Sequence, residues 1–371
     1  ADRLVETAPG AWLTATSFTD EKGRVLQVQS TNARGLRELV TTRYDFADQV
    51  QGSYAVHQGP HGATTDSVLV RETPRYDFAG RLLATTQTLG HVRQGRLQEG
   101  PATTLAKLRY NELGQVLQKH LGDSTAATAL QTVDFAYNIR GWLTQVNNPE
   151  QLTQPNQKPD LFGLALHYDC GFLTPQYNGN LSGQTWRSAS DNVERAYGYS
   201  YDAVNRLHQG DFVARTGPAA TAPWGAERDN YRFWATSYDA NGNLLTLRRR
   251  GLVQEASRAT PRRYGETDNL RYRYQPAAGS PEVAGNRLLR VDELAPDPAT
   301  FGILQPQRPD FSDGATNGIG QELYATDGAK NPDYAYDAAG GLISDKNKGI
   351  DSIRYNHLRL PMRIVWANGD R

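Results

Sequence analysis

The sequence is short of the groups that cross-link a chain, anchor it in a membrane or give it a strong charge. Cys170 is the single cysteine among 371 residues, so no disulfide forms within the chain, and a disulfide-linked secreted scaffold is excluded. No run of about 18 apolar residues occurs, so no membrane-spanning segment is predicted. The 40 basic and 40 acidic residues cancel. We therefore expect no nucleic-acid partner, because such binders usually carry a basic excess.

Apolar side chains are also scarce. Hydrophobic residues make up 38% of the chain, and its mean hydropathy is −0.64. A length of 371 residues allows either one large core or an extended array. So low a hydropathy fits a thin sheet, with water or polar contents on one face, better than it fits one thick core.

What the sequence contains instead is a recurring Tyr-Asp unit. One copy reads Tyr76-Asp77-Phe78-Ala79-Gly80-Arg81-Leu82, and the pattern returns at Tyr201-Asp202, Tyr238-Asp239 and Tyr336-Asp337. Weaker copies lie between these, at Tyr44-Asp45, Tyr110-Asn111, Tyr137-Asn138, Tyr168-Asp169 and Tyr355-Asn356. Most neighbouring copies are roughly 27–37 residues apart, which is the spacing of a repeat architecture.

Each copy is predicted to form a β-hairpin. Val133, Phe135 and Tyr137 alternate along the chain, and this period of two places them on one face of a strand. The acid or amide after the tyrosine can accept backbone hydrogen bonds, as in an Asx-turn, and the glycine three residues later supplies a positive φ. A second strand follows at once, as in Trp142-Leu143-Thr144-Gln145-Val146.

Stacked hairpins of this kind predict an all-β fold. One hairpin is marginal alone, but stacked hairpins bury each other's faces and form a continuous, spiralling or curved sheet. We expect a single array over residues 1–371, with an irregular insertion at 276–332. A β-propeller is the main alternative fold, but its blades need about 40–45 residues each and repeat at regular intervals. The positions predicted to be structural turn residues, rather than catalysts, are Tyr76, Asp77, Gly80, Tyr110, Gly114, Tyr137, Gly141, Tyr201, Asp202, Tyr238, Asp239, Gly242, Tyr336, Asp337 and Gly340.

No residue pattern predicts a catalytic, cofactor or metal site. Gly198-Tyr199-Ser200-Tyr201 does not match the Gly-x-Ser-x-Gly elbow of a serine hydrolase, and no phosphate-binding loop occurs. Asp239-Ala240-Asn241-Gly242-Asn243 fits a repeat turn better than a calcium loop, because position twelve is Arg250 rather than glutamate. His57 and His61 lie four residues apart, but a glycine and a proline between them favour a loop over a metal-binding helix. We therefore expect no enzyme and no cofactor.

The unit Tyr-Asp-x-x-Gly-Arg-Leu resembles the YD repeat of RHS proteins, the rearrangement-hotspot family, which includes the B and C components of insecticidal Tc toxins and the teneurin shells of animals. The resemblance covers about residues 18–366 and includes the variants Tyr137–Leu143 and Tyr355–Pro361. It implies hairpins that wind into part or all of a hollow shell, which in many bacterial members encloses a C-terminal toxic domain. Members of the family free that cargo at a motif built around Asp-Pro-x-x-Gly. Residues 1–371 lack this motif, so no protease carboxylate is assigned.

Together, the repeat and the resemblance predict a non-enzymatic shell segment, part of a larger secreted or cell-surface bacterial protein, that encapsulates or displays a polypeptide. Its partner would be an enclosed or adjacent polypeptide of the same parent protein, or copies of itself. One alternative is a structural or adhesive module whose copies pair edge to edge into a filament or lattice. A weaker alternative is a carbohydrate-binding module in which Trp142, Trp186 and Trp234 contact a glycan, although such residues more often pack between hairpins.

Overall fold

The computed structural model describes residues 14–32, 34–61, 64–93, 96–123, 128–153, 158–172, 174–217, 222–257, 260–277, 280–295, 332–367 and 369–370. Within these residues, hydrogen bonding assigns β1 to β19 to a 19-stranded antiparallel sheet and β20 to β24 to a five-stranded one. The predicted all-β fold class is confirmed. The described residues contain no helix with the length and apolar character needed to cross a membrane.

The chain divides into two compact units. Unit 1 contains Ala1–Ala165 and Arg187–Asp191, and unit 2 contains Leu166–Trp186 and Asn192–Arg371. β12 (Phe162–His167) and β13 (Gly183–Ser188) have residues in both units. Nothing in the repeat pattern indicates this boundary, because the Tyr-Asp copies continue on both sides of it.

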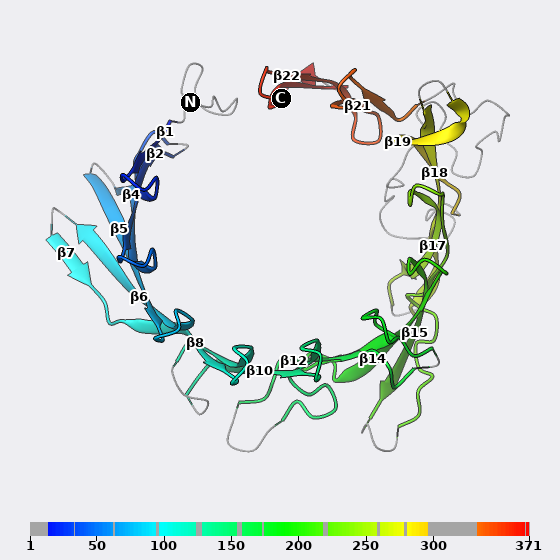
Figure 1. The fold of residues 1–371 in the computed structure, drawn as a ribbon, viewed down its shortest axis with the longest axis horizontal. Coiled ribbons are helices and arrows are strands. Elements are labelled where there is room, and N and C mark those ends of the chain that lie inside the picture. The colour runs from blue at the N-terminus through cyan, green and yellow to red at the C-terminus, as the bar shows by residue number, and fades with distance from the viewer. Residues whose placement is uncertain are drawn as a thin grey trace. The chain divides into compact units, whose positions relative to one another are not determined.

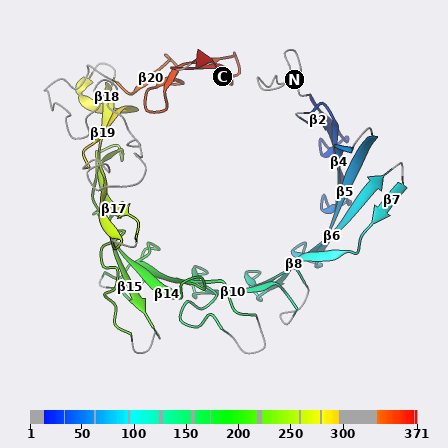
Figure 2. The same ribbon diagram turned by 180° about the vertical axis from the view of Figure 1, so that it is seen from behind.

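Unit 1 is a series of antiparallel hairpins that follow each other along the chain. Figure 1 shows its strands, coloured blue to green, as a single layer, and Figure 2 shows β7 beside the outer end of β6. The strands are β1 (Ala15–Thr19), β2 (Val25–Thr31), β3 (Arg37–Tyr44), β4 (Val50–His61), β5 (Thr64–Tyr76), β6 (Leu82–Arg93), β7 (Arg96–Glu99), β8 (Thr103–Tyr110), β9 (Val116–Leu121), β10 (Gln131–Tyr137) and β11 (Leu143–Val146).

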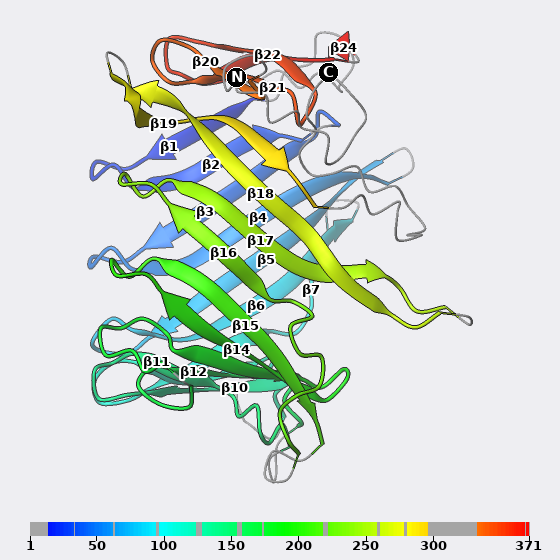
Figure 3. The same cartoon turned by 90° about the vertical axis from the view of Figure 1, so that its right-hand side faces the viewer.

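Unit 2 continues the same antiparallel pattern, and its longest strand, β18, has 15 residues. Figure 3 shows β17, β18 and β19 side by side, with β18 as the long diagonal strand. Of the 19-stranded sheet, unit 2 contains β14 (Val193–Tyr201), β15 (Leu207–Thr216), β16 (Phe233–Tyr238), β17 (Leu244–Gln254), β18 (Arg263–Ala277) and β19 (Ser280–Glu293). Its second sheet contains β20 (Tyr334–Tyr336), β21 (Leu342–Asp345), β22 (Ile350–Tyr355), β23 (Pro361–Trp366) and β24 (Gly369–Asp370).

The prediction of an irregular insertion at 276–332 was wrong for part of that segment. Residues 280–293 form β19, and β18 extends to Ala277. The pairing is irregular at this end of the hairpin, since Pro276 pairs with Ala284 after a register shift. Bulges of this kind accommodate residues that a regular ladder would not. Residues 296–331 lie outside the described part of the chain.

The hairpins share a bulge beside their turns. In the hairpin of β5 and β6, Arg75 pairs with Ala84 but Tyr76 pairs with Leu82, so one residue of β6 is left over. The same shift occurs at Tyr44, Tyr110, Tyr137, Tyr201, Tyr238, Tyr274, Tyr336 and Tyr355. A bulge increases the local twist and redirects a side chain. The repeated tyrosine therefore lies at the same kind of bulge in each of these hairpins.

The apolar core is thin in both units, as the low hydropathy predicts. The buried apolar side chains of unit 1 include Ala84 and Leu152, and those of unit 2 include Phe212 and Val291. Many large apolar side chains remain exposed on the strands and turns. A single-layer sheet buries little on either face, so backbone ladders and contacts between repeats must supply much of the order.

Candidate functional site

The repeated turns follow one hydrogen-bonding plan. In the hairpin of β5 and β6, the N–H of Asp77 donates to the carbonyl of Arg81 at 2.9 Å, and the N–H of Gly80 donates to the carbonyl of Asp77 at 3.0 Å. Asp77 Oδ1 accepts from the N–H groups of Ala79 and Arg81, both at 2.9 Å. Gly80 has φ +79°, a left-handed conformation that glycine adopts without a steric penalty.

The plan recurs throughout the described residues. The same pair of backbone hydrogen bonds is made at Asp20, Asn32, Asp45, Asn111, Asn138, Asp202, Asp239, Asp337 and Asn356. The third residue after each acid or amide has a positive φ, and these residues are Gly23, Gly35, Asp48, Gly114, Gly141, Asn205, Gly242, Gly340 and Arg359. Asn, Asp and Arg therefore replace glycine in three turns. Asp239 and Gly242 lie in such a turn, where the Asp239 carboxylate accepts from Asn241 and Asn243.

One weaker copy of the unit does not form this turn. β12 ends at His167, and the carbonyl of Tyr168 accepts from the N–H of Gln176 at 2.7 Å. Gly171 has φ +82° and lies only two residues after Asp169, rather than three. A Tyr-Asp pair without the correctly spaced residue therefore does not suffice for the turn.

Where an arginine follows the residue with positive φ, its side chain closes the turn. Arg81 Nε donates to Asp77 Oδ2 at 2.7 Å, and Arg206 Nε donates to Asp202 Oδ2 at 2.6 Å. Hydrogen bonds from the backbone and the guanidinium of Arg81 hold the pKa of Asp77 below its ordinary value. These carboxylates are therefore charged and fully engaged in the turn, which leaves them poorly suited to proton transfer.

The same arginine also connects one repeat to the next. The Arg81 guanidinium lies over the ring of Tyr110, 5.0 Å from its centroid, and Tyr110 Oη donates to the carbonyl of Leu82 at 2.8 Å. In unit 2, Arg206 lies 4.6 Å from the centroid of Tyr238. We call this arrangement the inter-repeat lock: a tyrosine of one hairpin held by the arginine and the adjacent carbonyl of the preceding hairpin.

The hydroxyl half of the lock is widespread. Tyrosine hydroxyls donate to a carbonyl of the preceding hairpin in the pairs Tyr137 to Val116, Tyr201 to Leu181, Tyr238 to Leu207, Tyr274 to Leu244 and Tyr355 to Leu342. Tyr76 and Tyr336 end their strands opposite Leu82 and Leu342. Sequence reasoning missed this role, although the arginine that follows Gly23, Gly80 and Asn205 was a visible signal for it.

Unit 2 adds buried ion pairs between neighbouring strands. Glu194 and Arg215 lie directly opposite each other on β14 and β15 and form two hydrogen bonds, at 2.9 and 3.0 Å. The side chain of Glu194 is 1% exposed and that of Arg215 is 9% exposed. The Arg215 guanidinium also lies 4.4 Å from the centroid of Trp224. Burial and pairing at both ends make this a structural cross-strand clamp.

Aromatic side chains form a continuous cluster in unit 2. Tyr197 packs against Trp186, with ring centroids 5.6 Å apart, and against Phe212 at 5.2 Å. Its hydroxyl donates to the carbonyl of Tyr231 at 2.6 Å. Burial raises the pKa of the neighbouring Tyr199 to about 12. These tyrosines are therefore neutral packing residues at any physiological pH.

The three tryptophans considered for glycan contact all have packing partners. Trp186 stacks on Tyr197. The ring of Trp142 lies 4.9 Å from the guanidinium of Arg140, and that of Trp234 lies 5.1 Å from the guanidinium of Arg248. Glycan binding by an aromatic ladder remains a prediction that no observation on these rings favours.

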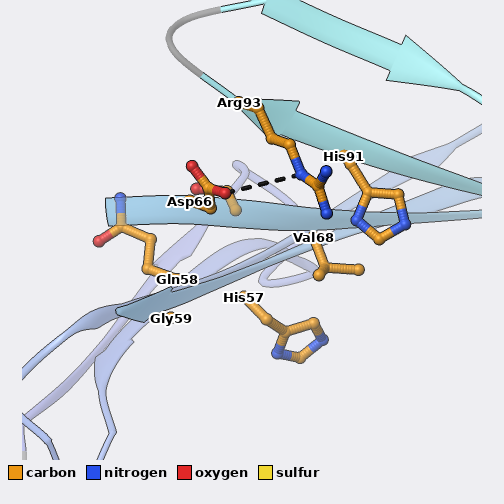
Figure 4. A pocket seen from close by; sticks show the side chains of 8 residues that line it. His57, Gln58, Gly59, Asp66, Val68, His91 and Arg93 are labelled. Carbon is orange, nitrogen blue, oxygen red and sulfur yellow. Dashed lines mark ion pairs between the residues drawn. The ribbon is translucent and has the colours of Figure 1, made fainter. Parts of the chain in front are cut away.

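A cavity of about 370 Å³ lies on one face of unit 1. His57, Val68 and His91 are directly opposite each other on β4, β5 and β6, so they form a row across the sheet. Figure 4 shows the two imidazoles on this row, with Arg93 directed toward Asp66. The cavity is lined by His57, Gln58, Gly59, Asp66, Ser67, Val68, His91 and Arg93.

The charged groups of this cavity are already paired. His57 Nδ1 contacts the carboxylate of Glu38, its direct cross-strand neighbour, and Arg93 Nε lies 3.7 Å from Asp66 Oδ2. No group of three or more potential metal ligands occurs in the described part of the chain. The predicted loop at His57 was wrong, because β4 runs to His61. The side chain of His61 lies outside the described residues.

Comparison with known proteins finds similarity only at the level of structure. No protein-family model and no curated protein matches the chain. A Tc holotoxin pore from Photorhabdus luminescens is 13% identical, with a TM-score of 0.34, over 95% of this chain and 19% of that one. The TcdB2–TccC3 complex is 16% identical, with a TM-score of 0.25, over 70% of this chain and 15% of that one. The TcdB2–TccC3–Cdc42 complex is 14% identical, with a TM-score of 0.26, over 96% and 18%. The chain thus spans less than a fifth of the length of each.

Proposed function

We propose that this chain is a non-enzymatic scaffold of the RHS type that encloses or displays a polypeptide, in a secreted or cell-surface protein. The observation that carries the proposal is the recurrence of one turn plan and one inter-repeat lock in both units. The repeated tyrosines, acids and arginines contact the local backbone and the neighbouring hairpin, so their role is to hold the sheet together. The resemblance of the Tyr-Asp unit to the YD repeat supports the same role.

The turn tips supply a surface suited to a polypeptide. The side chains of Phe46, Phe78, Leu113 and Ile139 are 84–104% exposed, and each lies at the tip of a repeat turn in unit 1. Successive tips are two strands apart, or about 10 Å. An extended polypeptide places every third residue at about the same spacing. Exposed apolar side chains at such intervals favour contact with an unfolded chain over contact with water.

The experiment that tests this role measures binding of a permanently unfolded polypeptide. A fluorescently labelled, reduced and carboxymethylated protein serves as the probe in an anisotropy titration. We expect binding by the wild type and a clear loss in the double variant Phe78→Ser/Ile139→Ser. Both side chains are 104% exposed, so the fold should not change. The matched control is Leu97→Ser, which removes a half-exposed apolar side chain away from the tips. No binding by the wild type, or equal loss in the control, would refute the proposal.

A second candidate is self-assembly through a sheet edge. β1 pairs only with β2 among the described strands, and all five of its residues are exposed. An edge strand of this kind can template pairing with another chain. Light scattering over a range of concentrations separates the two candidates. A mass that rises with concentration supports assembly, whereas a constant monomer mass removes this candidate and leaves the polypeptide scaffold.

A further inference from the structure

Asp160 is a buried carboxyl group without a counter-charge. It precedes β12 in unit 1 and is 4% exposed, while its N–H donates to the carbonyl of Leu152 at 2.7 Å. Its carboxylate forms no hydrogen bond or ion pair within the described part of the chain. Burial and the negative charge of Asp134 raise the pKa of Asp160 to about 6. The buried carboxyl group of Asp160 therefore shares its surroundings with a second carboxyl group and has no counter-charge among the described residues.

The two carboxyl groups share a cavity of about 310 Å³. Asp134 is on β10, and Gln145 on β11 pairs with Ala136, so they project from neighbouring strands. The residues that line the cavity are Asp134, Phe135, Ala136, Gln145, Asn147, Asn148 and Asp160. None of these lining residues is basic, and none is a histidine or cysteine. The polar side chains in the wall are carboxylates and carboxamides, which offer oxygen ligands only.

The wall of this cavity is fixed by hydrogen bonds of its own. Asn147 Oδ1 accepts from the N–H of Asp134 at 2.8 Å, and its Nδ2 donates to the carbonyl of Phe162 at 2.9 Å. Gln118 Nε2 donates to Asp134 Oδ1 at 2.7 Å. A Cβ added at Gly163 would lie 2.7 Å from the backbone nitrogen of Pro149, so the loop after β11 packs directly on β12. The carboxylate of Asp134 and the backbone of Asp160 are therefore both held by hydrogen bonds beside the cavity.

We propose that this cavity binds a calcium ion through Asp134 and Asp160, with the Gln145 side-chain oxygen and water completing the coordination. Ca²⁺ prefers carboxylate and carbonyl oxygens and tolerates irregular geometry, whereas Zn²⁺ and copper favour nitrogen or sulfur. Asp160 is almost fully buried and no basic side chain lines the cavity, so a small cation is the counter-charge that fits this site. Two carboxylates balance the charge of one Ca²⁺. So small a ligand set places the affinity in the weak range of about 10⁻⁴–10⁻³ M.

The test is calorimetric titration of the full chain with CaCl2 after removal of metals with EDTA. We expect one Ca²⁺ per chain for the wild type and a rise in its thermal midpoint with millimolar CaCl2. Asp160→Asn and Asp134→Asn should each weaken binding at least about tenfold. Asp351→Asn, at an exposed position outside the cavity, is the matched control and should bind as the wild type does.

Two results would overturn the proposal: a wild type that takes up no Ca²⁺, or an Asp160→Asn variant that binds as tightly as the wild type. Circular dichroism of each variant establishes that it is folded. Asp160→Asn removes an uncompensated charge, so loss of the fold is not expected from it. The outcome is independent of the scaffold function, because polypeptide binding at the turn tips is measured separately.

Discussion

Glu194→Gln should strongly destabilise unit 2. The substitution keeps the size of the side chain but removes its charge, which breaks the ion pair with the Arg215 guanidinium, a group that is only 9% exposed. Breaking a buried pair by removing one partner costs about 3–5 kcal/mol. Arg215 keeps its contact with Trp224, at 4.4 Å, and a cation–π contact returns part of that cost. We therefore expect a loss near the lower end, about 3 kcal/mol.

The assay is urea unfolding followed by tryptophan fluorescence, together with amide hydrogen exchange in β14 and β15. The matched control is Glu255→Gln, which removes the same charge from an exposed pair with Arg262, where the side chains are 64% and 60% exposed. No measurable change is expected there, because water already screens that pair. A double replacement of Glu194 and Arg215 by leucine should recover most of the loss, since apolar side chains then replace both members of the buried pair. Equal effects of Glu194→Gln and Glu255→Gln would refute the reasoning.

Three further outcomes follow from the turns, the lock and the acidic cavity. Tyr238→Phe removes the 2.8 Å hydrogen bond to the carbonyl of Leu207 and should lower the free energy of unfolding by about 1 kcal/mol, whereas an unchanged urea midpoint would show that the lock contributes nothing. Gly242→Ala should lower the free energy of unfolding by about 1–2 kcal/mol. The cause is the φ of +87° and not a steric clash, because an added Cβ would meet nothing within 4 Å. Gly242→Asn should lower it clearly less. In EDTA at pH 8, Asp160→Asn should stabilise the protein by at most about 3 kcal/mol. The raised pKa of about 6 means that the ionised Asp160 is unfavourable in the folded state. The figure is an upper limit because water in the cavity screens part of that cost. This gain should shrink as the pH falls through about 6 and vanish below the ordinary pKa of 3.8, where the wild-type group is protonated in both states, and a gain that does not depend on pH would contradict it.

The sequence determined the local structure of this protein. One short segment contains everything that specifies a hairpin: a strand with period two, an acid or amide, and a glycine three residues later. Each of these features acts through the backbone next to it. For this reason the hairpin at Asp77 and Gly80 follows from its own residues. The copy at Tyr168 shows the limit of that reading, because a Tyr-Asp pair without the correctly spaced turn residue does not form the repeat turn after β12.

Only the tertiary structure decided what lies between the repeats. The lock joins Arg206 to Tyr238, and the clamp joins Glu194 to Arg215, so each depends on how neighbouring strands pair and in which register. The cavity of Asp134 and Asp160 depends further on a loop that returns to pack on β12. A sequence pattern states which residues alternate on a strand, but pairing register and loop packing set which side chains meet. Burial and the charge of a neighbour arise only once those side chains have met, and they give Asp160 its altered pKa.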